Sequence, residues 1–216
     1  MGILFEDGNF ALFRAGFLQT VELSALSALL ALLIGTLLAA FRVSPVPALR
    51  AFGTVWVNAF RNTPLTLLFF AVAFGLPRLD VHFSSFVFAV LALGLYTASF
   101  VCEVLRSGIN TVPLGQAEAA RSLGMNFGQT LGLIVLPQAA RSVLGPMSSV
   151  FIALPRNSAV AGAFSVSELF STQQTLTERG YNIFAIFFWL AAAYLSISAL
   201  VAVIFRLLEN RLAVAR

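Results

Sequence analysis

The sequence has 216 residues, of which 59% are hydrophobic and only 10% are charged, and its mean hydropathy is +0.93. Charged residues make up about a quarter of a water-soluble domain, so these values exclude an ordinary soluble protein and indicate a membrane protein. All 13 basic residues are arginines, against 9 acidic residues. A chain without lysine cannot be a P-loop ATPase, whose lysine must reach the nucleotide phosphates. One cysteine and one histidine exclude an internal disulfide and a His/Cys metal cage, and arginines scattered between apolar runs disfavour nucleic-acid binding.

Several apolar runs are long enough for a helix to cross the hydrocarbon core, which requires about 20 residues. They cover roughly residues 15–41, 52–76, 83–105, 142–164 and 183–205. The alternating polarity of a membrane β-barrel is missing from these runs, so helices are expected. We therefore predict an all-α membrane protein that forms a single transmembrane domain over residues 1–216, with about five spanning helices.

The distribution of arginine predicts the orientation, because cytoplasmic loops near spanning helices are enriched in basic residues. The segments expected inside contain Arg42 and Arg50, then Arg106, Arg121 and Arg141, then Arg206, Arg211 and Arg216. The alternate segments are close to charge balance, with Glu6, Asp7 and Arg14, then Arg78 and Asp80, then Glu168, Glu178 and Arg179. This pattern predicts an N-terminus outside and a C-terminus inside.

The inside segment of roughly residues 106–141 is too long for a simple connection, which usually has about 2–8 residues between helices. Pro113 suits the first turn of a helix that Gly124 would end. A second short helix is expected from Phe127 to Leu136, ending at Pro137. We predict two short helices with an alanine-lined surface that another protein could approach closely. The alternative is an amphipathic connector lying on the membrane surface.

This segment carries a recognisable motif. Glu118-Ala119-Ala120, then Gly124, then nine further residues before Ile134-Val135-Leu136-Pro137, resembles the EAA signature of permease subunits of bacterial ABC importers. In that family the segment is a coupling helix that docks on the ATPase. The residues implied for coupling are Gln116, Glu118, Ala119, Ala120, Arg121 and Gly124.

Other motifs narrow the resemblance to the polar amino acid (HisMQ-like) branch. The Arg61 to Leu65 stretch resembles its Arg-Gly-Thr-Pro motif with Asn62 in place of glycine. Tyr96 and the Glu103 to Ile109 stretch resemble its third span and the approach to the EAA loop, and the match covers roughly residues 16–205. The resemblance implies a MetI-like permease fold in the bacterial inner membrane. The implied partners are two ATPase subunits, a second permease copy or a sister permease, and an extracytoplasmic solute-binding protein, with membrane lipid around the complex and no nucleic acid. No cofactor is expected on this chain, because ATP and Mg would lie in the ATPase.

Arginines at membrane depth are functional hypotheses by default. Arg61 follows Arg50 by eleven residues, roughly 16 Å along a helix, and is followed by Thr63 and Pro64, where the helix should open. Arg156 follows Arg141 by fifteen residues, roughly 22 Å, directly after Pro155. The predicted substrate pathway comprises Arg61, Asn62, Thr63, Pro64, Tyr96, Arg156, Asn157 and Ser158. For Arg61 the alternative is an internal ion pair or an arginine that caps carbonyls at the break, and for Arg156 it is a side chain that snorkels to the outer headgroups. Glu22 could pair with either arginine.

The substrate is predicted from what the chain lacks. Family members for basic or broad substrates often carry a Lys-Asp pair and an upstream acid where this chain has Arg156-Asn157 and Val150. An uncompensated cation at low dielectric attracts a carboxylate, so we expect an acidic amino acid, glutamate first. A basic or glutamine-type substrate is the alternative.

Two other classes of protein are less favoured. A secondary transporter would work without ATP, but no inverted repeat is detectable and the EAA loop would lack a purpose. An intramembrane enzyme is disfavoured because no residue set to activate a nucleophile is present. We predict a transport subunit without catalytic residues.

Overall fold

The computed structural model describes residue 3, residue 6 and residues 8–212. Asp7 and Arg216, which entered the orientation argument, lie outside the described residues. The described part of the chain is all-helical. Its elements are α1 (Asn9–Val43), α2 (Pro47–Asn62), α3 (Leu65–Phe70), η2 (Ala71–Gly75), η3 (Leu76–Leu79), α4 (Ser85–Asn110), α5 (Leu114–Ser122), α6 (Phe127–Gln129), η4 (Thr130–Val135), α7 (Leu136–Asn157), η5 (Ser158–Phe164), α8 (Leu169–Glu178) and α9 (Ile183–Leu212).

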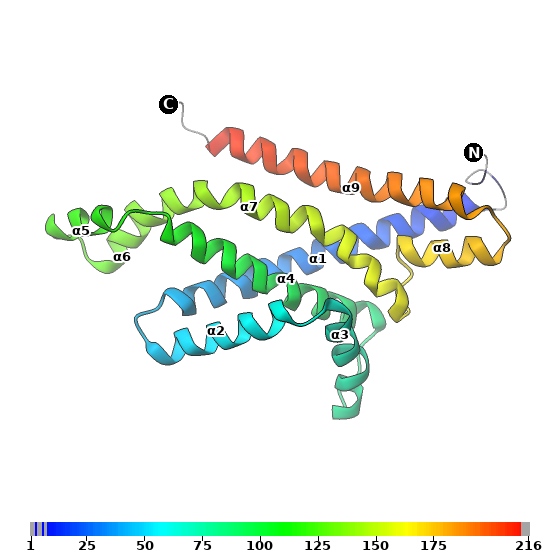
Figure 1. The fold of residues 1–216 in the computed structure, drawn as a ribbon, viewed down its shortest axis with the longest axis horizontal. Coiled ribbons are helices and arrows are strands. Elements are labelled where there is room, and N and C mark those ends of the chain that lie inside the picture. Colours follow the sequence, from blue (N-terminus) through cyan, green and yellow to red (C-terminus); the bar gives the residue numbers. More distant parts are fainter. Residues whose placement is uncertain (1–2, 4–5, 7, 213–216) are drawn as a thin grey trace.

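The long helices run side by side along one axis (Figure 1). α1 packs against α4, α4 against α7, and α7 against α9. α5 and α6 project at one end of this bundle, where α9 also ends, whereas α8 and the start of α1 lie at the other end (Figure 1). Because α1 begins and α9 ends at opposite ends of the bundle, the arrangement is compatible with the predicted orientation.

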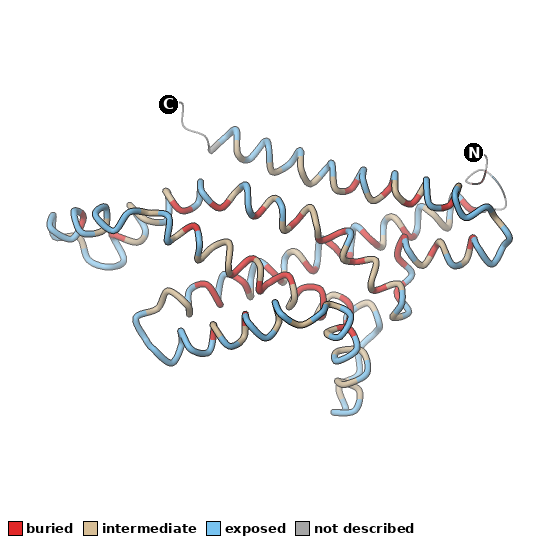
Figure 2. The backbone as a smooth tube through the Cα atoms, in the orientation of Figure 1, coloured by how far each residue is buried: buried red, intermediate tan, exposed pale blue. Residues whose placement is uncertain are grey.

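Small residues let α1 and α4 approach closely. A Cβ on Gly35 of α1 would lie 2.6 Å from Val101 Cγ1, and one on Gly94 of α4 would lie 2.6 Å from Leu30 Cδ2. The buried positions gather where these helices face one another, while the outer faces of the bundle are exposed (Figure 2). Many of those exposed residues are large and apolar, such as Leu33 and Leu195, as expected for helices that face lipid and not water.

Within the described residues, three helices are long and apolar enough to cross a membrane: Asn9–Val43, Ser85–Asn110 and Ile183–Arg211. The pair formed by Pro47–Asn62 and Leu65–Leu79 gives a fourth if it is one broken span. α7, which corresponds to the fourth predicted span, is not among them. The all-α membrane fold is therefore confirmed, and the number of five spans remains a prediction.

The predicted span over residues 52–76 contains a sharp bend, and its crossing of the membrane stays a prediction. The helix bends by 106° between Asn62 and Leu65, and α3 then leaves the bundle nearly at right angles (Figure 1). Thr63 is extended, with φ −90° and ψ 130°, as a following proline favours, and Pro64 cannot donate a hydrogen bond to continue the helix. The local opening predicted at this proline is therefore a sharp change of direction.

The second short helix of the 106–141 segment does not end at Pro137. Helical turns continue from α6 through the π-helical η4 into α7, and Pro137 lies in the first turn of α7. The wider turns of a π-helix change the hydrogen-bond register, so that the missing N–H of proline is accommodated. α7 consequently begins at Leu136, earlier than the predicted span at residue 142, and its α-helical turns end at Asn157, after which η5 is a 3-10 helix.

The helix α8 was not predicted. Its residues are mostly serine, threonine and glutamine, so hydropathy gave no signal. Glu168 caps its N-terminus, with the carboxylate accepting a hydrogen bond from Ser171 N at 3.0 Å. The helix packs against α1 and α9 and closes the end of the bundle opposite α5.

Candidate functional site

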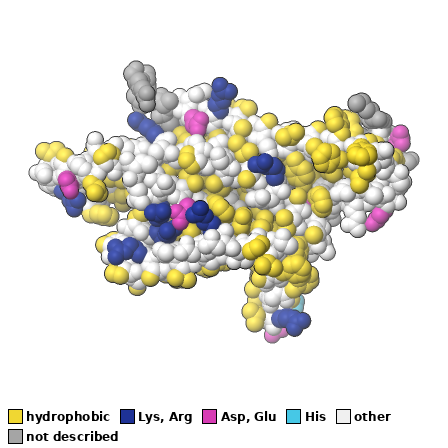
Figure 3. Space-filling view, viewed as in Figure 1, with side chains coloured by type: hydrophobic (Ala, Val, Ile, Leu, Met, Phe, Trp, Pro, Cys, Tyr) yellow, Lys and Arg dark blue, Asp and Glu magenta, His cyan; other side chains and the backbone are white. Residues whose placement is uncertain are grey.

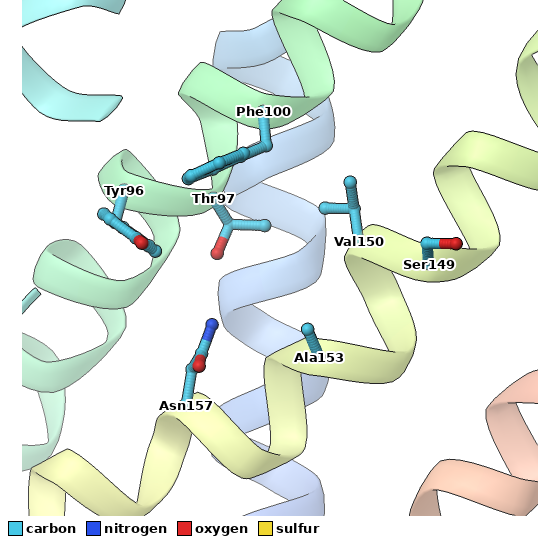
Figure 4. A pocket seen from close by; sticks show the side chains of 7 residues that line it. All are labelled: Tyr96, Thr97, Phe100, Ser149, Val150, Ala153 and Asn157. Atoms are coloured by element: carbon cyan, nitrogen blue, oxygen red, sulfur yellow. The ribbon is translucent and has the colours of Figure 1, made fainter. Parts of the chain in front are cut away.

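A pocket of about 320 Å³ lies between α4 and α7. Its lining residues are Tyr96, Thr97, Phe100, Ser149, Val150, Ala153 and Asn157. Figure 4 shows Tyr96 and Thr97 from α4 and Asn157 from α7 directed toward the same space. Its volume is at the lower end of the range of small-molecule sites, about 300–1,000 Å³, so it suits a ligand the size of an amino acid.

Helical periodicity explains which residues line this pocket. Tyr96 and Phe100 are four residues apart on α4, and Val150, Ala153 and Asn157 follow one another at spacings of three and four on α7. Such spacings place side chains on one face of a helix. The lining offers hydroxyl and amide groups but no charged side chain, so it can form hydrogen bonds to a substrate without an ion pair of its own.

The structure brings two of the predicted pathway residues together, Tyr96 and Asn157. Sequence reasoning missed Thr97, Phe100, Ser149 and Ala153 as lining residues. The same three- and four-residue spacing from Tyr96 and Asn157 would have found Phe100 and Ala153.

The predicted pathway residues from Arg61 to Pro64 lie beside the pocket and not in it. Arg61 is in the last turn of α2, with about half of its side chain exposed, and its guanidinium carbon lies 5.9 Å from the ring centroid of Phe100. Its Nη1 is 3.8 Å from Oε1 of Glu103. The predicted alternative of an internal ion pair for Arg61 is therefore present, but with Glu103 and not with Glu22, which is exposed on α1.

The neighbours of Arg61 have local roles. Asn62 is exposed and ends α2. Thr63 Oγ1 donates a hydrogen bond to the carbonyl of Ala59 at 2.7 Å, which secures the last turn before the bend. Pro64 precedes the first residue of α3. These three residues shape the bend and do not line the pocket.

Of the predicted pathway residues that follow Pro155, only one lines the pocket. Arg156 is exposed and lies outside the pocket lining, whereas its neighbour Asn157 is in that lining. Ser158 is fully buried, and its hydroxyl donates to the carbonyl of Pro155 at 2.7 Å. Ser158 therefore provides a hydrogen bond to a backbone carbonyl at the end of α7 and does not line the pocket.

The segment predicted to couple to an ATPase, α5 and the turn after it, projects from the end of the bundle (Figure 1). Gln116, Glu118, Ala119, Arg121 and Gly124 are exposed. Ala120 is buried against the rest of the chain, at 4% exposure, so the alanine surface is in part an internal packing surface. Gly124 has φ +84°, a conformation that side chains disfavour and that turns the chain after α5.

Two further details secure this segment. Arg121 Nε donates to the carbonyl of Ala117 at 3.3 Å. Asn126 and Gln129 form a capping box at the start of α6, with both hydrogen bonds at 2.9 Å. The turn between α5 and α6 is therefore well defined without a partner protein.

No three His, Cys, Asp or Glu side chains of the described residues form a group that could hold a metal ion. The chemistry that the site offers is hydrogen bonding and charge attraction around a pocket, together with a projecting helical element. A pocket inside a bundle of apolar helices, together with a projecting helical element, is typical of a membrane transport subunit.

Comparison with known proteins gives the family. Residues 31–214 match the family described as "Binding-protein-dependent transport system inner membrane component". The chain is 39% identical to the glutamate transport system permease protein GluC of Corynebacterium glutamicum, over 100% of both chains. It is 32% identical to the probable glutamine ABC transporter permease protein GlnM of Bacillus subtilis, over 98% of this chain and 97% of that protein.

Solved structures agree with the sequence comparison. A crystal structure of an amino acid ABC transporter with histidines superposes with a TM-score of 0.87, at 26% identity over 94% of both chains. The MetNI methionine ABC transporter, in an inward-facing conformation, shares the fold with a TM-score of 0.81, at 19% identity over 97% of this chain and 100% of that chain.

The chain belongs to the family of binding-protein-dependent transport system inner membrane components. It is a permease subunit of an ABC importer, and the resemblance to the polar amino acid branch is confirmed. Its place is the inner membrane.

Proposed function

We propose that this permease forms half of the pathway of an ATP-driven importer for an acidic amino acid, glutamate first. The proposal is based on the charge around the pocket. No carboxylate is present among the lining residues, and the Arg61 guanidinium lies over the ring of Phe100, which is one of them. Val150 and Asn157 line the pocket, at positions where the family resemblance implies that members for basic or broad substrates often carry an acid. Arg61 faces Glu103, but Arg42 and Arg106 share that carboxylate, so positive charge remains in excess beside the pocket and favours an anionic ligand.

The relatives support the same proposal. The permease named for glutamate transport matches over the whole length of both chains. We propose that the partners are two ATPase subunits, a second permease copy or a sister permease, and an extracytoplasmic solute-binding protein. ATP-driven closure of the ATPases would act on α5, and substrate delivered from outside would pass the pocket between α4 and α7.

Glutamine is the second candidate. The pocket lining is formally neutral and contains an amide and hydroxyl groups, which can hydrogen-bond a carboxamide as well as a carboxylate. The relative GlnM is named as a probable glutamine permease. The two candidates differ in whether Arg61 contributes to recognition.

The test is uptake of labelled glutamate by the assembled importer in proteoliposomes, with ATP inside. Competition by unlabelled aspartate, glutamine, arginine and histidine gives the order of preference. Glutamate and aspartate should compete best, and Arg61→Gln should reduce glutamate uptake more than glutamine uptake. Preferential transport of arginine or histidine would reject the proposal, and uptake that survives without nucleotide but collapses with an ion gradient would indicate a secondary transporter.

A further inference from the structure

Arginines from two helices converge on Glu103 of α4, with a third on α4 itself. Its carboxylate accepts hydrogen bonds from Arg42 of α1 and from Arg106, the latter at 2.9 Å from Nη2, and Arg61 of α2 lies 3.8 Å away. Figure 3 shows basic side chains gathered around an acidic one on this face of the bundle. Three guanidinium groups share one carboxylate, so two positive charges of this cluster have no counter-charge within it.

A cavity of about 480 Å³ opens beside this cluster, at the end of the bundle where α1 ends and α2 begins. It is lined by Arg42, Arg50, Ala51, Thr54, Val55 and Arg106. Three of these six residues are arginines, one is a hydroxyl donor and none is acidic. The Nε of Arg106 is buried and makes no hydrogen bond within the described part of the chain. A buried guanidinium donor without a partner points to a missing acceptor.

The cavity is connected to the pocket through a series of contacts. Phe100 lines the pocket, and Arg61 lies 5.9 Å over its ring. Arg61 also faces Glu103, which binds Arg42 and Arg106 at the wall of the cavity. Phe100 and Glu103 lie on successive turns of α4, so the positive charge extends from the pocket toward the end of the bundle that carries α5.

We propose that the cavity lined by Arg42, Arg50 and Arg106 is a second anion site, which holds the side-chain carboxylate of the substrate on the cytoplasmic side before release. This inference rests on the proposed transport of an acidic amino acid. A carboxylate with its two oxygens matches the planar donor array of arginine. It would supply the acceptor that Arg106 Nε lacks and offset the excess positive charge. The connection to the pocket through Arg61 favours the transported carboxylate over a lipid phosphate.

Binding at this site can be followed with a native fluorophore. Trp56 lies on α2, next to the lining residue Val55. The chain has 2 tryptophans, and the other is Trp189. In a Trp189→Phe background, with the tryptophans of the partner subunits also replaced by phenylalanine, the complete importer in nanodiscs of phosphatidylcholine is titrated with glutamate and, separately, with glutamine. Glutamate should give a saturable change in Trp56 fluorescence, and glutamine should give little or none.

The variants distinguish this site from the pocket. Arg50 lines the cavity and donates a long hydrogen bond, 3.4 Å, to the carbonyl of Ser44. Arg50 forms no ion pair with Glu103, so Arg50→Gln leaves the Glu103 cluster in place. Arg50→Gln should weaken the glutamate response at least tenfold, Arg106→Gln should weaken it further, and Arg50→Lys should retain part of it. Arg206→Gln, at an exposed position on α9 outside the cavity lining, is the matched control and should leave the response unchanged.

The outcomes separate the two proposals. If the wild-type importer takes up no glutamate, the proposed function fails. If it takes up glutamate, but Arg50→Gln binds and transports it as the wild type does, only the second site is rejected. An equal response to glutamine rejects the site as well, and so does a fluorescence change that requires phosphatidylglycerol in the nanodisc, because a lipid phosphate would then be the occupant.

Discussion

At the scale of single residues, the clearest feature of the pocket is that position 150 carries a valine. The side chain is partly buried and lines the pocket together with Tyr96 and Asn157. Val150→Glu would place a carboxylate a few ångströms from a bound acidic substrate. Like charges at such a distance cost several kcal/mol at the dielectric of a protein interior, and about 1.4 kcal/mol corresponds to a tenfold change.

We therefore expect Val150→Glu to lower kcat/KM for glutamate by about tenfold or more, measured as uptake by reconstituted importer. Val150→Thr, which has a similar volume and no charge, should retain most of the uptake and serves as the control. An unchanged KM for glutamate in Val150→Glu would place the substrate elsewhere.

A second prediction concerns Glu168, which is fully buried between α1, α8 and α9. Its Oε2 accepts a hydrogen bond from the Tyr194 hydroxyl at 2.6 Å, and its Oε1 accepts one from Ser171 N at 3.0 Å. Burial raises the pKa of this carboxyl, although hydrogen bonds from Phe170, Tyr194, Ser171 and Thr20 act in the opposite direction. Because the folded state holds the proton more tightly than the unfolded chain, Glu168 favours folding most below its ordinary pKa of about 4.3, and this contribution decreases as pH rises through the raised pKa.

Thermal unfolding of the detergent-purified protein between about pH 5 and pH 8 should therefore show a loss of stability that Glu168→Gln removes. Glu168→Ala should destabilise at every pH, because it leaves buried donors without an acceptor at a cost of about 1–3 kcal/mol each. A pH profile identical in wild type and Glu168→Gln would contradict the assignment to this residue.

At the scale of helices, the coupling element gives the sharpest prediction. Glu118 is exposed on α5, and Gly124 adopts φ +84° directly after that helix. Glu118→Lys should reverse the charge presented to the ATPase, and Gly124→Val should force a β-branched residue into a disfavoured conformation at a cost of about 1–3 kcal/mol. Both changes should abolish ATP-driven uptake while membrane insertion, measured as the amount of protein in the membrane fraction, stays normal.

The control for this pair is Glu178→Lys, a charge reversal at an exposed position at the end of α8, at the opposite end of the bundle. It should keep normal uptake. Full transport by Glu118→Lys and Gly124→Val would mean that α5 does not couple the two subunits.

The helices also show what could be predicted from the sequence. Hydropathy located the three longest apolar helices, and the EAA motif located α5, because both signals are local. The 106° bend at Pro64 and the passage of η4 into α7 depend on packing around the two prolines. α8 escaped detection because its stability comes from the Glu168 cap and from contacts with α1 and α9 and not from its own hydropathy.

The site was predicted less completely than the fold. Tyr96 and Asn157 do face one pocket, but Arg61 and Ser158 have other partners, Glu103 and Pro155. The ion pair between Arg61 of α2 and Glu103 of α4 joins residues that are distant in sequence. No local sequence pattern predicts which acidic residue pairs with a given arginine. The convergence of arginines on Glu103 likewise required the packing of α1, α2 and α4.

At the scale of the whole molecule, the orientation in the membrane can be tested directly. Cys102 is the one cysteine of the sequence and is buried. Its replacement by alanine gives a background without thiols, into which single cysteines can be introduced. Ala48 is exposed at the start of α2, near the end of the bundle that carries α5, and Glu178 is exposed at the other end. In intact cells, a membrane-impermeant maleimide should label Glu178→Cys and should label Ala48→Cys only after the membrane is permeabilised. The reverse pattern would overturn the predicted orientation.

Helical turns follow one another without a break from Phe127 through η4 to Asn157, so one segment joins the projecting end of the bundle to a wall of the pocket. A continuous helical segment transmits rotation as well as displacement, so a tilt imposed at its projecting end would rotate Val150 and Asn157 about the segment's axis relative to Tyr96 on α4. The π-helical turns of η4 are a place where helices bend, and they lie between the projecting end and the pocket wall. Bending there would set how much of the rotation reaches the pocket. Solute would then experience a twist of one wall against the other, and not a uniform widening of the passage.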